Sequence, residues 1–105
     1  MIETVQAIAD PRRLSILKMV RLTEMSAGDI AGQFPGITRP AVSQHLGILK
    51  EAGLIAERRE GTRRLYRLRP EGFHPLKDLL EDFWNPRLEK LKTAAEKAEQ
   101  KRRKS

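Results

Sequence analysis

The stretch Thr-Arg-Pro-Ala-Val-Ser-Gln-His-Leu-Gly-Ile-Leu-Lys, residues 38–50, has the spacing of a short amphipathic helix. An α-helix turns by about 100° per residue, which places Val42, Leu46 and Leu49 on one arc of its surface. Thr38 is a favourable N-cap residue for this helix because its hydroxyl can accept a hydrogen bond from the first turn. We therefore predict a helix that buries one face and exposes the other.

The exposed face of this predicted helix carries few apolar atoms and several hydrogen-bonding groups. Arg39, Ser43 and Gln44 fall on it, and Pro40 falls in the first turn, where its missing N–H group costs nothing. Arginine suits the O6/N7 edge of guanine, glutamine suits the N6/N7 edge of adenine, and serine adapts to several bases. The pattern favours a helix that reads the major groove of DNA. His45 falls within the inward arc, so we interpret it first as a hydrogen-bonded packing residue and second as a phosphate contact.

The preceding residues indicate a shorter helix followed by a tight turn. Ser26 is a favourable helix cap, and Asp29 stands three positions later, where a carboxylate can complete a capping box. The Pro-Gly pair at positions 35–36 predicts the turn. Residues 26–52 therefore fit a helix-turn-helix reading motif, although the same pattern also fits any small helical hairpin.

Residues 54–69 have the pattern of a basic β-hairpin. Gly53 is suited to end the reading helix, and Gly61, between polar residues, marks the hairpin loop. In the second arm, Tyr66 and Leu68 alternate with polar residues, as in a half-buried strand. We predict a wing that lies along the DNA backbone; the alternative is a solvated ribbon without a partner. The arginines of this hairpin are Arg58, Arg59, Arg63, Arg64, Arg67 and Arg69.

Four stretches of the chain match one family pattern in nearly continuous register. They are Ala-Ile-Ala-Asp-Pro-Arg-Arg-Leu-Ser-Ile-Leu at 7–17, Met-Ser-Ala-Gly-Asp-Ile at 25–30, Ile-Thr-Arg-Pro-Ala-Val-Ser-Gln-His-Leu at 37–46 and Leu-Lys-Glu-Ala-Gly-Leu-Ile at 49–55. Together they resemble the ArsR family of winged-helix transcriptional repressors. The resemblance implies a homodimer that binds a palindromic operator and represses transcription until a signal releases it.

The chain departs from the metal-sensing members of that family. Those members have cysteine at the position of Ser26 and often at that of Gly28, whereas this chain has no cysteine, which excludes a thiolate site for soft metals. The paired carboxylate and histidine spacing of the family's second metal site is also absent. His74, Asp78 and Glu81 do have helical spacing, which leaves open an oxygen and nitrogen site shared within a dimer. However, acidic residues early in a helix also complement the helix dipole, and His74 is then an exposed flanking residue.

Length and charge agree with one small nucleic-acid-binding domain. The 105 residues carry a formal net charge of +7, and residues 39–69 hold eight basic and three acidic side chains, a local excess of five. We expect a cytoplasmic protein without a membrane segment, because the chain lacks cysteine, a signal-peptide pattern and any apolar run of spanning length. We do not expect an enzyme, since there is no cysteine nucleophile, no glycine-rich phosphate loop and no serine with a visible base partner.

The last third of the chain has a long apolar stripe at helical spacing. We predict that residues 2–9 and 75–96 of two copies pack into a two-fold dimer; the alternative is a cover over the winged helix of the same chain. The pair Asn85-Pro86 predicts a kink or break, with Trp84 packed at the elbow. The predicted dimer residues are Ile2, Val5, Leu76, Leu79, Leu80, Phe83, Trp84, Leu88 and Leu91.

The predicted fold is mainly α with a small β-hairpin, in the order of four helices, two strands and a final helix. Residues 1–96 form the winged-helix DNA-binding and dimerisation domain, and residues 97–105 form a charged, disordered tail. The predicted function is sequence-specific regulation of transcription on double-stranded DNA, with contact to protein or RNA as the alternative. Without cysteine, the candidate releasing signals are a small apolar ligand near Trp84, a partner protein, or simple regulation by concentration.

Overall fold

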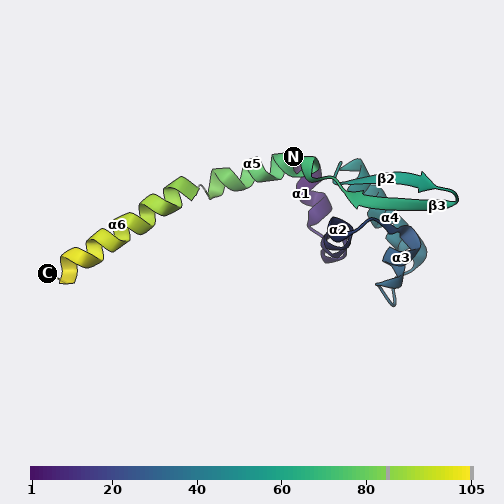
Figure 1. The fold of residues 1–105 in the computed structure, drawn as a ribbon, viewed down its shortest axis with the longest axis horizontal. Helices are drawn as coiled ribbons and strands as arrows, with labels where there is room; N and C mark the ends of the chain where they lie inside the picture. The colour runs from purple at the N-terminus through teal and green to yellow at the C-terminus, as the bar shows by residue number, and fades with distance from the viewer. Residues whose placement is uncertain (85, 105) are drawn as a thin grey trace. The chain divides into compact units, whose positions relative to one another are not determined.

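The computed structural model describes residues 1–84 and 86–104, without the side chains of residues 86, 88, 103 and 104. The chain divides into two compact units, Met1–Pro75 and Leu76–Ser105, and each is described by itself. The first unit holds the helix-turn-helix and the hairpin (Figure 1), and the second holds most of the C-terminal helical segment.

The N-terminal unit packs four α-helices against a small sheet (Figure 1). A short 3₁₀ helix, η1, follows the last strand and leads into the C-terminal segment. The elements of this unit are α1 (Ile2–Ile8), α2 (Pro11–Leu22), β1 (Met25–Ser26), α3 (Ala27–Gly32), α4 (Arg39–Glu51), β2 (Ile55–Glu60), β3 (Arg63–Leu68) and η1 (Pro70–Phe73).

The sheet has three antiparallel strands in the order β1-β3-β2, whereas the sequence predicts only the hairpin of β2 and β3. The additional strand β1 is two residues long, with Met25 opposite Tyr66 and Ser26 opposite Leu65. Two residues are too few to show the alternating pattern that identifies a strand. The prediction therefore missed the strand that attaches the wing to the start of α3.

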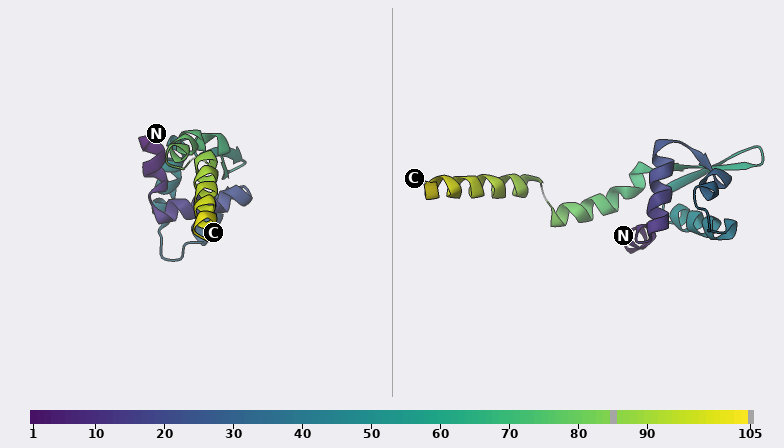
Figure 2. Two further views of the ribbon diagram at one scale, coloured as in Figure 1. Left: turned by 90° about the vertical axis from the view of Figure 1, so that its left-hand side faces the viewer. Right: turned by 90° about the horizontal axis from the view of Figure 1, so that it is seen from below.

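The hairpin turn is the tight two-residue type. Glu60 pairs with Arg63, so Gly61 and Thr62 form the loop between the two strands. Gly61 has a φ of +63°, while no residue other than glycine among those described has a positive φ. A positive φ at the first loop position alone corresponds to a type II′ turn, whose twist matches that of the strands. The tip of the hairpin extends past the helices of the N-terminal unit into solvent (Figure 2).

One hydrophobic core joins α2, α3 and α4 to the sheet. The inward arc of α4 is confirmed, since Val42, Leu46 and Leu49 are all buried. The amphipathic spacing of α4 thus places this helix with one face in the core and the other in solvent. The remaining buried members of the core are Ala7, Ile16, Leu17, Val20, Ile30, Leu54, Ile55 and Tyr66.

Local capping groups set both ends of the reading helix as predicted. Thr38 Oγ1 accepts a hydrogen bond from the Ala41 N–H group at 3.3 Å. At the other end, Gly53 has a φ of +77°, and its N–H group donates to the Lys50 carbonyl while the Leu54 N–H group donates to the Leu49 carbonyl, both at 3.0 Å. These two bonds form a Schellman motif, which ends the helix and directs the chain into the wing.

Of the capping box predicted at the start of α3, the Ser26 bond is present but the Asp29 side-chain bond is not. Ser26 Oγ accepts from the Asp29 N–H group at 3.0 Å, but the Asp29 carboxylate pairs with Arg63 of the wing at 3.4 Å. A tertiary ion pair therefore takes the side chain that the sequence assigned to a capping box.

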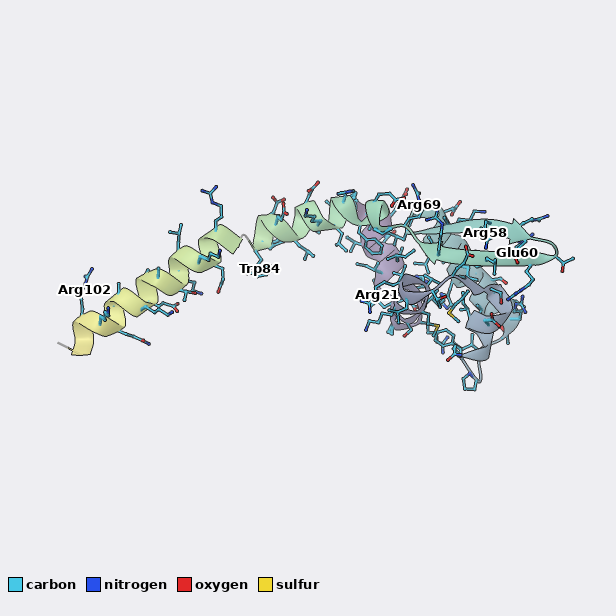
Figure 3. All side chains as sticks on the ribbon, in the orientation of Figure 1. Arg21, Arg58, Glu60, Arg69, Trp84 and Arg102 are labelled. Carbon is cyan, nitrogen blue, oxygen red and sulfur yellow. The ribbon has the colours of Figure 1, made fainter. Side chains whose placement is uncertain are left out.

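The C-terminal unit confirms a break near Pro86. Helix α5 spans His74–Phe83 and helix α6 spans Pro86–Lys104, so the proline stands in the first turn of a new helix. Trp84, predicted to pack at the elbow, is 62% exposed (Figure 3). Leu76 and Leu79 are half-buried. The exposed members of the predicted dimer set are Ile2, Val5, Leu80, Phe83, Trp84 and Leu91, and the side chain of Leu88 lies outside the described residues.

The prediction of a disordered tail differs from the structure, in which α6 continues through Lys104. The segment that begins at Lys97 consists of Lys, Ala, Glu, Gln and Arg up to that point. These residue types have the highest intrinsic helix propensities, so a charged segment without apolar side chains can still continue a helix. Ser105 lies outside the described residues.

Candidate nucleic-acid interface

The outer face of α4 presents the predicted reading residues to solvent. Arg39, Pro40, Ser43 and Gln44 are all exposed, on the face opposite the buried leucines. None of the four has a side-chain hydrogen bond or ion pair with another described residue. Their polar groups are therefore free to approach a ligand.

A cleft of about 660 Å³ separates this face of α4 from the wing. Arg39, Ser43 and Lys50 line it from the helix, and Arg63 and Arg64 line it from the hairpin. Lys50 was missed at the sequence level, although it stands three turns after Arg39 on the same helical face. The cleft thus has basic groups on both walls.

Glu57 is the acidic group within this cleft, and it links the helix to the wing. Its Oε2 accepts from Lys50 Nζ at 3.2 Å and from the Tyr66 hydroxyl at 3.3 Å, and its Oε1 lies 3.8 Å from Arg64 Nε. Burial acts to raise the pKa of the Glu57 carboxyl, but the hydrogen bond and charge of Lys50, with smaller contributions from Tyr66 and Arg64, lower it overall. Burial, followed by the charge of Glu57, raises the pKa of the Tyr66 hydroxyl.

Arg58 of the hairpin is paired with the carboxylates of Glu24 and Glu60. Its Nε and Nη2 donate to the two oxygens of Glu24 at 2.8 and 2.6 Å, and Nη2 lies 3.0 Å from Glu60 (Figure 3). These hydrogen bonds between Arg58 and Glu24 lower the pKa of the Glu24 carboxyl and raise the pKa of the Arg58 guanidinium. This arginine therefore anchors the hairpin to the residue before β1, a role that the sequence does not reveal.

Arg59 and Arg64 stand directly opposite each other on one face of the hairpin. Residues two apart on a strand share a face, so this pair lies on the same side as Glu57 and Tyr66, which line the cleft. Like charges directly opposite each other are unfavourable without a counterion. Glu57, 3.8 Å from Arg64 Nε, is such a counterion for Arg64, whereas Arg59 has no ion pair with another described residue and is suited to an external anion.

Arg67 belongs to the other face of the hairpin, together with Arg58. It is exposed. The pKa of the Glu71 carboxyl is lowered mainly by a backbone hydrogen bond and then by Arg69, and the charge of Arg67 makes the smallest contribution there and at Glu24. The predicted wing arginines thus do not form one patch. By strand alternation Arg59 and Arg64 share one face and Arg58, Arg63 and Arg67 share the other, although Arg63, at the tip of the hairpin, also lines the cleft.

His45 faces α2 rather than the cleft. Its ring is half-buried, and Nδ1 lies 3.3 Å from Nη1 of Arg13. This contact supports the interpretation of His45 as a packing residue. The Arg13 partner was not identified from the sequence, because 32 residues separate the two side chains.

Comparisons with known proteins agree with this geometry. A family model described as a helix-turn-helix domain matches residues 8–58. The HTH-type transcriptional regulator Rv2034 of Mycobacterium tuberculosis is 43% identical over 79 residues, which cover 75% of this chain and 73% of that protein. The transcriptional repressor SdpR of Bacillus subtilis is 46% identical over 56 residues, which cover 53% of this chain and 61% of SdpR.

Solved structures give the same relationship over most of the chain. A crystal structure of a possible transcriptional regulator for arsenical resistance is 34% identical, with a TM-score of 0.72, and the match covers 90% of this chain and 97% of the other. An ArsR-like transcriptional regulator from Rhodococcus sp. RHA1 is 27% identical, with a TM-score of 0.68 and coverage of 90% and 91%. The chain belongs to the ArsR family.

As a member of the ArsR family, the protein is a DNA-binding transcriptional regulator with a winged-helix fold, and it is not an enzyme. This assignment confirms the predicted family and the predicted mainly α class. Within the described residues, no group of three or more His, Asp and Glu side chains is arranged to hold a metal ion. In the same part of the chain, no helix has both the length and the apolar character needed to cross a membrane.

Proposed function

We propose that the protein is a repressor that binds a palindromic operator as a homodimer, with Arg39, Ser43 and Gln44 reading base edges in the major groove. The observation that carries this proposal is the open outer face of α4 beside the basic cleft. Arginine and glutamine on that face match the edges of guanine and adenine, and neither side chain has a hydrogen bond or ion pair with another described residue that would have to break first.

Phosphate contacts come from the start of α4 and from the wing. The exposed N-terminus of α4 offers the positive end of the helix dipole, although Pro40 has no N–H group and the N–H groups of Ala41 and Val42 already donate to Thr38. Arg59 and Arg64 supply the cleft side of the wing, and Arg67 supplies the opposite side. Arg58, Arg63 and Arg64 already have carboxylate partners, so they orient the wing and share their charge with a phosphate.

The homodimer is supported by the apolar side chains of the terminal helices. Ile2 and Val5 of α1 are exposed, as are Leu80 and Phe83 of α5 and Leu91 of α6. A two-fold dimer on B-DNA places two reading helices about 34–36 Å apart, one turn of the duplex. The operator is then a palindrome with half-sites at that separation.

Selection of bound fragments from genomic DNA, followed by gel-shift titration, tests the proposal. We expect one palindromic motif to be enriched and a dimer to bind it. With roughly 6–10 phosphates neutralised, the affinity should fall by about 10³–10⁵ between 50 and 200 mM salt. Binding without any selected sequence would overturn the assignment of base-reading residues, and sedimentation as a monomer at micromolar concentration, on and off DNA, would overturn the dimer.

A further inference from the structure

The Asp-Pro-Arg-Arg segment at residues 10–13 has no part in the proposed DNA contacts, yet it lies at a junction of three helices. Asp10 Oδ1 accepts from the N–H groups of Arg12 and Arg13 at 2.8 and 3.3 Å and so begins α2. Although burial opposes the shift, these backbone hydrogen bonds, with the Arg13 charge, lower the pKa of the Asp10 carboxyl.

The Arg13 guanidinium connects α1 to the reading helix. Nε donates to the Ala7 carbonyl at 2.6 Å and Nη2 donates to the Gln6 carbonyl at 3.1 Å, both in the last turn of α1. Nη1 lies 3.3 Å from Nδ1 of His45 in α4, and 3.9 Å from Asp10. The Arg13 side chain is only 15% exposed, so these contacts form largely out of water.

A groove of about 510 Å³ lies between α1 and α4 beside this Arg13 link. Glu3, Gln6 and Ala7 line the groove from α1, Ile48 and Glu51 line it from α4, and Arg13 lies at its edge. Where two helices are separated by a groove, few packing contacts fix the angle between them. Helix α2 packs against both, and the planar guanidinium of its Arg13, with donors in fixed directions, bonds to both at once.

The contacts of Arg13 with α1 and with His45 each need an acceptor that faces the guanidinium. The final carbonyls of α1 have no partner within the helix, so they are available to a cation, which the helix dipole also favours at that end. Arg13 is always a donor, so its contact with His45 is a hydrogen bond only when Nδ1 of His45 carries no proton. His45 lies on α4 next to Gln44, so this contact joins Arg13 to the helix that carries the reading residues.

We propose that Arg13 is a positioning residue that fixes α4 relative to α1 and thereby sets the half-site spacing that the dimer accepts. This inference rests on the proposed function, in which α1 contributes to the dimer and α4 reads the operator. Because α1 is tied to the two-fold axis, the angle between α1 and α4 determines how far apart the two reading helices lie.

The test measures affinity for operators in which the distance between half-sites is native, one base pair shorter or one base pair longer. For the wild-type protein we expect a clear preference for the native spacing. We expect Arg13→Lys, which keeps the charge but loses the planar fork, to bind the native spacing roughly tenfold more weakly, about 1.4 kcal/mol, with little loss on the altered spacings. Arg12→Lys, on the exposed neighbour, is the matched control and should keep the wild-type preference.

A second pair of variants addresses the acceptor directly. His45→Leu removes the acceptor and should flatten the spacing preference, whereas His45→Asn places an amide oxygen near the position of Nδ1 and should restore it. Thermal unfolding of each variant excludes loss of folding as the cause. The inference fails if Arg13→Lys and His45→Leu stay folded and retain the wild-type spacing preference. If the wild-type protein itself shows no selective binding, the proposed function fails instead.

Discussion

Gly72 of η1 lies against the backbone of Gly53 so closely that a Cβ atom on Gly72 would overlap the Gly53 carbonyl group. Gly53 ends the reading helix, and η1 leads directly into α5. The Arg69 N–H group donates to the Leu54 carbonyl at 2.8 Å in the same region. The end of α4 and η1 therefore share one tightly packed junction, in which glycine is required at position 72 for space.

We predict that Gly72→Ala lowers the free energy of unfolding by roughly 1–3 kcal/mol, because the added methyl group meets backbone that cannot move without disturbing the end of α4. Urea unfolding of the variant and the wild-type protein measures the difference. Gly32→Ala is the control: its Cβ has no atom within 4 Å and its φ is helical, so it should stabilise α3 by about 0.5–1 kcal/mol. Equal stability of Gly72→Ala and wild type would show that the junction relaxes freely.

We predict that Gln44→Ala weakens binding to the selected operator by about 1–3 kcal/mol and leaves binding to random DNA unchanged. The reason is that Gln44 is exposed on the reading face and has no side-chain hydrogen bond with another described residue, so its loss removes mainly a base contact. Competition gel shifts with operator and random duplexes measure the two affinities. An equal loss on both duplexes would contradict its role as a base reader.

Arg59→Ala provides the contrasting control for a phosphate contact. Arg59 lies at the wing, exposed, with no ion pair to any described residue. Its removal should weaken binding to all sequences alike and reduce the slope of log affinity against log salt by about 1. A loss confined to the operator would instead place Arg59 at a base.

The features that could be predicted from the sequence are those that depend on neighbouring residues. Thr38 caps α4 through a group three positions away, and Gly53 and Gly61 adopt positive φ values that their own lack of a Cβ permits. The helical arc of α4 could also be predicted, because burial of Val42 and Leu49 follows from a fixed turn per residue.

The features that could not be predicted depend on residues brought together by the fold. Arg58 meets Glu24 across 34 positions, and Arg13 meets His45 across 32. An arginine-rich hairpin gives no indication of which guanidinium groups are already neutralised by carboxylates. The sequence therefore predicts a basic wing, but only the folded structure shows that Arg58 is paired with a carboxylate and that Arg59 has no ion pair with another described residue.

We predict that the stability contributed by Glu57 depends on pH. The pKa of the folded carboxyl lies below its ordinary value of 4.5, so the ionised form is favoured by folding. The contribution is present at full size above the unfolded pKa and is lost as the pH falls through the folded pKa. The difference in unfolding free energy between the wild-type protein and Glu57→Gln should therefore be largest near neutral pH and shrink in acid. Urea unfolding across that range tests this, and a difference independent of pH would show that Glu57 acts through packing alone.

We predict that Phe83→Glu shifts the protein from dimer to monomer. Phe83 is 83% exposed within one chain, at the end of the strongly amphipathic helix α5, and a buried charge in a dimer contact is costly. The dimer dissociation constant should rise by at least about tenfold, measured by sedimentation over a range of concentrations. Leu22→Glu is the matched control, because Leu22 is 77% exposed but belongs to α2, outside the predicted dimer helices. If Leu22→Glu dissociates the dimer and Phe83→Glu does not, the interface lies on the face of α2 instead.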